Sequence, residues 1–376
     1  MRLDRGFETA EGKRFLVEEG MVDHAQNKAV QLQSTTVETI TQSDTWENSL
    51  HQALDWLDHQ ERMIKDSSLR SHHRLLQDLN SYSLELEEYA AVNFKRQIEN
   101  HVQFNAEDYF GLYDKLVLLR SRIGELRERV TRMNEQELVM VRDQFRNQEI
   151  SSTAFSLLLK EFCDLRRYGN KAFGNYDDAD AFFDQLVGID RDRAPYEKGY
   201  QRDMVFYQPT PVHLVLEMVD ALKPTHHDVI YDLGAGYGRV CLLISLLTQV
   251  QTRGVEYFES YITYTRQRAA VVGREAQALF IEGDVRDVDL SDGTIFYLFN
   301  HFGGETLRAV MDRLKQIATT RTITVCSLGM CSGVIAKEPW LIQREDSGDS
   351  TMYHLQFFTS QLVADQVQEP TMSTGA

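Results

Sequence analysis

Apolar residues in the first half of the chain recur three and four positions apart, the spacing of amphipathic helices. Between residues 109 and 145 the spacing is heptad-like, with charged residues between the apolar ones. We therefore predict a series of helices in this half. They cover residues 43–57, 69–100, 109–145, 153–167 and 179–187.

Proline separates this half from the rest, because all six prolines lie at or after Pro195. A stretch without proline permits long helices, since an interior proline costs roughly 3 kcal/mol. We expect an α-helical domain over residues 43–194, after a weakly structured segment 1–42 with poor apolar periodicity. Two interpretations of this domain stay open. It is either a packed bundle, or a helical hairpin that forms a homodimer or docks a protein partner.

From residue 228 onward, short apolar runs of strand length alternate with helical patterns, which predicts a doubly wound parallel sheet. The predicted strands cover residues 228–233, 252–257, 278–282, 294–299 and 322–327, with a closing hairpin from 340–345 and 353–360. The predicted helices cover residues 240–247, 260–272 and 304–318. We therefore expect a Rossmann-like α/β domain over residues 195–362 and a flexible tail over 363–376.

Composition narrows the class of protein. Hydrophobic residues make up 42% of the 376, enough for a sizeable core, and the net charge is −17. That charge argues against affinity gained by neutralising nucleic-acid phosphates, so no nucleic-acid partner is expected. Four cysteines are too few for a disulfide scaffold and indicate reduced thiols. No signal sequence and no run of ~18 apolar residues is found, so we expect a cytoplasmic protein without a membrane span.

His72 and His73 are the one pair that suggests a metal site. Adjacent positions on a helix point in different directions, so the two rings cannot share one ion. We expect a surface pair of histidines and no metal.

A glycine-rich motif directly follows the first predicted strand. It reads Asp-Leu-Gly-Ala-Gly-Tyr-Gly over residues 232–238 and leads into an apolar helix. A dinucleotide fingerprint would place its third glycine where this chain has Arg239. Glu256 and Asp284 follow the next two predicted strands. A carboxylate at the Glu256 position can accept hydrogen bonds from both ribose hydroxyls of a nucleoside.

This order of motifs resembles the class I (seven-β-strand) S-adenosylmethionine (SAM)-dependent methyltransferases. The resemblance implies SAM as the cofactor, with Asp232 at its amino group, Glu256 at its ribose, and Tyr257, Asp284 and Val285 at its adenine. The glycines let the backbone approach the cofactor closely. They are Gly234, Gly236 and Gly238.

Two further segments of the sequence bear on which acceptor receives the methyl group. Asn300-His301-Phe302 follows the fourth predicted strand, and an aromatic segment with Tyr207 and Thr210 leads into the domain. The two resemble the seven-strand (non-SET) protein-lysine methyltransferases, although His301 departs from their pattern. The Asn-Pro-Pro-Phe/Tyr motif of DNA and amide methyltransferases is missing.

The resemblance implies transfer of a methyl group to a nitrogen acceptor, most simply a protein lysine. Thr210 would touch the methionine end of SAM, and Asn300 would contact both SAM and the methyl-transfer channel. Tyr207 and Phe302 would line that channel, where aromatic walls exclude water and favour a neutral amine. His301 is a candidate proton acceptor.

Simpler interpretations remain for each of these residues. Tyr207 and Phe302 can be core or lid aromatics, His301 a loop residue, and Thr210 a helix N-cap. Two other functions also remain open: a small-molecule methyltransferase, and a non-catalytic scaffold whose helical domain binds a protein.

Overall fold

The chain forms two compact units that divide within one long helix. One unit comprises residues up to 66 together with 78–129, and the other comprises 67–77 and 130–376. The computed structural model describes residues 46–64, 71–84, 106–163, 178–190, 194–195, 207–300, 302–345 and 354–361. The segments expected to be weakly structured, 1–42 and 363–376, lie outside these ranges. In the described ranges, no helix is long and apolar enough to cross a membrane.

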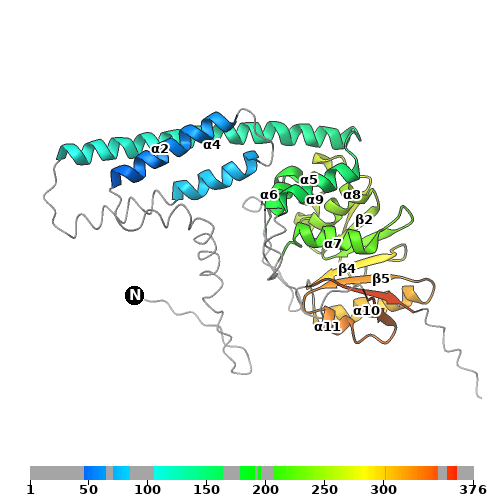
Figure 1. The fold of residues 1–376 in the computed structure, drawn as a ribbon. Helices are drawn as coiled ribbons and strands as arrows, with labels where there is room; N and C mark the ends of the chain where they lie inside the picture. The colour runs from blue at the N-terminus through cyan, green and yellow to red at the C-terminus, as the bar shows by residue number, and fades with distance from the viewer. Residues whose placement is uncertain are drawn as a thin grey trace, which may run out of the picture. The chain divides into compact units, whose positions relative to one another are not determined.

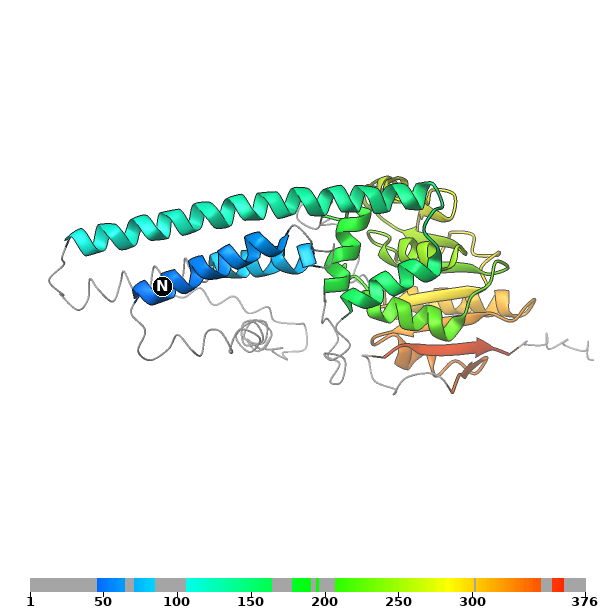
Figure 2. The same ribbon diagram turned by 45° about the horizontal axis from the view of Figure 1, so that its top comes forward.

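The first unit is helical, as predicted. Helix α2 (Trp46–Met63) lies alongside the first part of α4 (Ala106–Arg146), as Figures 1 and 2 show. Arg122 of α4 donates hydrogen bonds to Asp58 at 2.6 Å and to Glu61 at 3.0 Å, and so ties the two helices together. The heptad-like seam of α4 is buried in this unit. It includes Leu116, Leu119, Ile123 and Leu126.

The second unit contains the predicted doubly wound sheet, with seven strands in the order β3-β2-β1-β4-β5-β7-β6. The first five strands run parallel, and β7 is antiparallel to both β5 and β6. The closing pair of strands was therefore predicted correctly. The strands are β1 (Val229–Leu233), β2 (Gln251–Glu256), β3 (Ala278–Glu282), β4 (Ile295–Phe299), β5 (Thr324–Leu328), β6 (Leu341–Gln343) and β7 (Gln356–Ser360).

Helices cover both faces of the sheet, and a separate hydrophobic cluster lies on each face. One face carries α7 (Val212–Leu222), α8 (Arg239–Thr248) and α9 (Glu259–Val271). The opposite face carries α10 (Gly304–Ala318) and the short α11 (Ser332–Ile335), which the sequence analysis did not predict.

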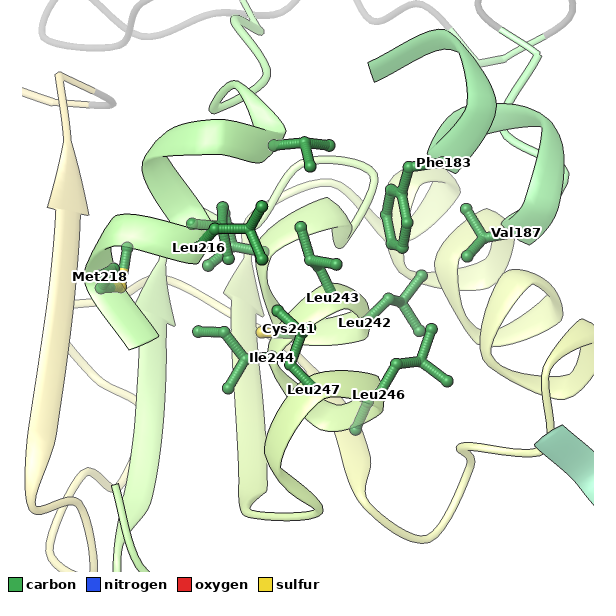
Figure 3. Close-up of a cluster of buried hydrophobic side chains, with 14 of the residues drawn as sticks. Phe183, Val187, Leu216, Met218, Cys241, Leu242, Leu243, Ile244, Leu246 and Leu247 are labelled. Atoms are coloured by element: carbon green, nitrogen blue, oxygen red, sulfur yellow. The ribbon is translucent and has the colours of Figure 1, made fainter. Parts of the chain in front are cut away.

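Helix α8 is buried nearly all round, because it lies between the sheet and an outer layer of helices. That layer contains α5 (Ser152–Phe162) and α6 (Asp178–Val187). Figure 3 shows side chains of α6 and α8 in the same hydrophobic cluster. The cluster also includes Phe145 of α4. The core of the second unit is therefore continuous across the boundary predicted at residue 194.

The prediction that His72 and His73 lie on the surface was wrong. Their side chains are 1% and 2% exposed, within a helical segment over residues 71–84. His72 lies 3.3 Å from Glu137 of α4, and the ring of His73 packs edge-on against Phe162 of α5. Adjacent helical positions are both buried here because neighbouring helices cover the segment on two sides.

Candidate functional site

Four polar side chains lie at the carboxyl ends of the first four strands of the sheet. Asp232 is the residue before the last in β1, and Glu256 is the last residue of β2. Asp284 follows β3, and Asn300 follows β4. These strands are parallel, so their carboxyl ends meet at one edge of the sheet. The strand order reverses at β1, between β2 and β4, and ligands of doubly wound sheets bind at such a point.

The glycine loop adopts a backbone that L side chains disfavour. Gly236 and Gly238 have φ angles of +53° and +73°. A Cβ at Gly236 would lie 2.3 Å from the ring of Tyr207, and one at Gly238 would lie 2.1 Å from Thr265. The absence of a side chain at Gly236 therefore permits contact with the 207–211 segment, and its absence at Gly238 permits contact with α9. Gly234 also has a positive φ, of +105°.

Asp232 and Glu256 form a buried acidic pair beside this loop, 2% and 9% exposed. Glu256 accepts hydrogen bonds from the backbone N–H groups of Gly236 at 2.9 Å, Tyr257 at 2.8 Å and Phe258 at 3.1 Å. Oδ1 of Asp232 has no hydrogen-bond partner among the described residues. Burial, together with the nearby charge of Glu256, raises the pKa of Asp232 to about 8. Such a site favours a cation.

The residues predicted at the adenine lie near the ends of β2 and β3. The ring of Tyr257 is 41% exposed and lines an open hollow of about 700 Å³ that Glu282 also lines. Val285 is buried. Asp284 accepts a 2.8 Å hydrogen bond from Nε of Arg286, and this guanidinium lowers the pKa of Asp284. Arg286 was not among the predicted site residues, although it lies only two residues after Asp284 in the sequence.

Asn300 has an unusual backbone for a residue with a side chain, with φ at +45°. Its Oδ1 accepts a hydrogen bond from the N–H of Cys331 at 3.2 Å. A Cβ at Gly329 would lie 2.2 Å from its Nδ2, so the amide rests against the backbone after β5. Non-glycine residues in this region of φ cluster at functional sites.

The other predicted acceptor residues have different surroundings. Phe302 is buried in the hydrophobic cluster beneath α10, which places it in the core. His301 lies outside the described residues. The ring of Tyr207 lies 4.2 Å from that of Tyr237 in the glycine loop. Tyr207 therefore contacts the glycine loop that is predicted to bind the cofactor.

Thr210 bridges to the sheet rather than capping a helix. Its hydroxyl shares a 2.9 Å hydrogen bond with that of Tyr297 on β4, and both side chains are buried. The N-cap residue of α7 is Pro211, so the alternative role of Thr210 as an N-cap was wrong. The N–H of Val212 is satisfied by Asp180 of α6, at 2.9 Å. These partners are distant in sequence, and the sequence offered no signal for either.

Comparison with known proteins finds similar curated sequences and many similar solved structures. No known protein-family profile matches the chain. A protein-lysine N-methyltransferase of Saccharolobus islandicus is 30% identical over 94 residues, which are 25% of this chain. The matched stretch spans 58% of the length of that relative.

Two methyltransferases are among the solved structures that are similar to this one. An RNA methyltransferase from Salinibacter ruber, in complex with S-adenosyl-L-homocysteine, has a TM-score of 0.32 and 21% identity, covering 43% of this chain and 97% of its own. A precorrin-6y C5,15-methyltransferase from Geobacter metallireducens has a TM-score of 0.32 and 16% identity, covering 47% and 96%. The second unit, with its doubly wound seven-stranded sheet and flanking helices, has a Rossmann-like fold.

Proposed function

We propose that the protein is a SAM-dependent methyltransferase that transfers a methyl group to a nitrogen atom of its acceptor, a protein lysine. The observation that carries the proposal is the buried Oδ1 of Asp232, which lacks a hydrogen-bond partner among the described residues. Burying a carboxylate costs free energy unless it is paired or hydrogen-bonded. The ammonium group of the SAM methionine moiety is the kind of partner that this position would take.

The neighbouring residues fit the rest of SAM. Glu256 already accepts three backbone hydrogen bonds, which hold its carboxylate in place. A carboxylate has about four lone-pair positions, so capacity remains for a ribose hydroxyl. Tyr257 would lie against the adenine, with Asp284 and Val285 beside it. Thr210 and the glycine loop would hold the methionine end.

When bound, SAM supplies an electrophilic methyl group on a sulfonium centre. The chain's task is to bring a nitrogen lone pair to it and to keep water away. A lysine must arrive as the neutral amine, because the ammonium form has no lone pair. Asn300, held by Cys331, would orient that amine, and Tyr207 would shield it. His301 is our candidate to receive the proton that the amine loses.

Two observations favour a protein lysine over a small molecule. The similar sequence from Saccharolobus islandicus is a protein-lysine N-methyltransferase. The chain also carries a net charge of −17, which suits a partner with a basic surface. A homodimer through the helical unit, a cytoplasmic location and the lack of a nucleic-acid partner remain predictions.

The test is transfer of a tritiated methyl group from SAM to the proteins of a cell lysate, followed by gel electrophoresis and analysis of labelled bands for methyl-lysine. Asp232→Ala and Asn300→Ala serve as controls that should lose the label. We expect discrete labelled proteins with the unaltered chain. Label confined to small molecules would contradict the lysine acceptor, and no label in any fraction would contradict the methyltransferase.

A further inference from the structure

Three charged side chains are buried together where α6 meets the start of α8. Asp180 and Asp184 of α6 are 1% and 8% exposed, and Arg239, the first residue of α8, is 2% exposed. Arg239 forms ion pairs with both carboxylates, through Nη1 to Asp180 and Nη2 to Asp184. A buried cluster of this kind is weak support for stability, since hydrophobic side chains of similar volume often serve as well. Its contacts are therefore the better guide to its role.

Asp180 contacts two separate parts of the predicted cofactor site through one atom. Its Oδ1 accepts from Arg239, which directly follows the last glycine of the loop. The same Oδ1 accepts from the N–H of Val212 at 2.9 Å, at the start of α7. Val212 lies two residues after Thr210, whose hydroxyl is bonded to Tyr297. One carboxylate oxygen thus joins the glycine loop to the segment that carries Thr210.

Helix geometry explains how two carboxylates are held around one guanidinium. Asp180 lies in the first turn of α6, and its Oδ1 accepts a hydrogen bond from the N–H of Val212, the first residue of α7. The N-terminus of a helix carries a partial positive charge and unpaired N–H groups. The N-termini of α6 and α7 therefore meet at Asp180 and offset the extra negative charge.

We propose that Asp180 is a positioning residue, which through Arg239 and Val212 holds the glycine loop and the Thr210 segment in register with each other. The inference rests on the proposed function, because the two parts that it joins are the predicted holders of the SAM methionine end. It also makes α6, which the sequence analysis assigned to a separate helical domain, part of the cofactor site.

The alternative is that Asp180 only fastens α6 to the domain, and Arg142 provides the matched control. Arg142 of α4 anchors the opposite end of the same helix, donating to the carbonyl groups of Gln185 at 2.7 Å and Leu186 at 2.9 Å. Arg142→Ala therefore loosens α6 without touching the glycine loop or Val212. Asp180→Ala removes the bridge, and Asp180→Asn keeps its shape and an acceptor oxygen.

The experiment compares these full-length variants by thermal unfolding, by calorimetric affinity for S-adenosylhomocysteine, and by hydrogen exchange at the amides of Val212 and Leu242. The N–H of Leu242 donates to the carbonyl of Gly238 at 3.0 Å and so reports on the glycine loop. We expect Asp180→Ala and Arg142→Ala both to lower the unfolding temperature. Asp180→Ala weakens ligand binding by about tenfold, or 1.4 kcal/mol. Asp180→Asn recovers part of that loss, and Arg142→Ala stays within about threefold of the unaltered protein. Equal affinity losses in Asp180→Ala and Arg142→Ala would overturn the proposal.

Hydrogen exchange separates failure of this proposal from failure of the proposed function. If the unaltered chain binds no S-adenosylhomocysteine, the proposed function fails and exchange alone decides the role of Asp180. The proposal then requires faster exchange at both Val212 and Leu242 in Asp180→Ala than in Arg142→Ala. Should Asp180→Ala not fold, Asp180→Asn takes its place in every comparison. Exchange rates no faster than those of Arg142→Ala would overturn the proposal.

Discussion

The hydroxyl groups of Thr210 and Tyr297 share a hydrogen bond of 2.9 Å between the segment before α7 and the middle strands of the sheet. Both side chains are buried, and burial raises the pKa of Tyr297 well above its usual range, so its hydroxyl stays protonated. The bond places Thr210 next to β4, whose end carries Asn300. It thus connects the residue predicted at the methionine end of SAM with the strand that leads to the acceptor.

Tyr297→Phe should remove this bond with little change in shape. We expect the free energy of unfolding to fall by about 1 kcal/mol, a typical value for one hydrogen bond. Affinity for S-adenosylhomocysteine should also fall, because Thr210 loses the partner that holds it. Chemical denaturation and calorimetry measure the two effects.

Tyr231→Phe is the matched control for that variant. Tyr231 is equally buried on the neighbouring strand β1, but its hydroxyl donates to Asp292, outside the predicted site. We expect a similar loss of stability and unchanged ligand affinity. If both variants weaken the ligand equally, the link from Tyr297 to the cofactor site is refuted.

Asp232 should make the ligand-free protein less stable as the pH rises. Its pKa is raised from 3.8 to about 8 in the folded chain, so the folded state keeps a proton that the unfolded state has released. Stability from this group is therefore full below about pH 4 and is lost as the pH rises toward 8. The side chain at this position does not titrate in the variant Asp232→Asn. As the pH rises from about 5 to about 8, we therefore expect the unfolding temperature of the unaltered chain to fall relative to that of Asp232→Asn. A constant difference would show that Asp232 is ionised throughout.

Gly329→Ala should disturb Asn300. The new Cβ would lie 2.2 Å from Nδ2 of Asn300, and Gly329 has a φ of +91° that alanine disfavours. We expect slower methyl transfer to lysate proteins and, because Asn300 is also predicted to contact SAM, weaker affinity for S-adenosylhomocysteine.

Gly333→Ala serves as the control for Gly329→Ala. Gly333 lies four residues further on, in α11, and a Cβ there meets nothing within 4 Å. We expect its transfer rate to match that of the unaltered chain. If Gly329→Ala transfers at the same rate as Gly333→Ala, Asn300 is not needed in the position that the structure gives it.

The sheet could be predicted from sequence because its signals are local. The apolar run before the Asp232 motif, the glycines and the next apolar helix occupy one short stretch, and β1 and α8 begin and end within two residues of the prediction. Glu256 and Asp284 could be placed at the same edge because parallel strands end there. The helix α11 was missed because four residues carry too little periodicity to be recognised.

The contacts that hold the site could not be predicted, because they join residues far apart in the chain. Nothing near Thr210 indicates Tyr297, and nothing near Arg239 indicates Asp180, since each pair meets only after the helices pack on the sheet. The same holds for His72, which lies 3.3 Å from Glu137 of another helix. Local patterns predicted which elements form, and the tertiary packing decided which side chains support the site.

The most direct test of the central claim is the calorimetric affinity of the full-length chain for S-adenosylhomocysteine, measured for the unaltered protein and for Asp232→Ala. We predict measurable binding by the unaltered chain and a loss of at least about tenfold in the variant, because the ligand's ammonium group would lose its carboxylate partner. Absence of binding to the unaltered chain, or equal affinity in the two proteins, would contradict the account.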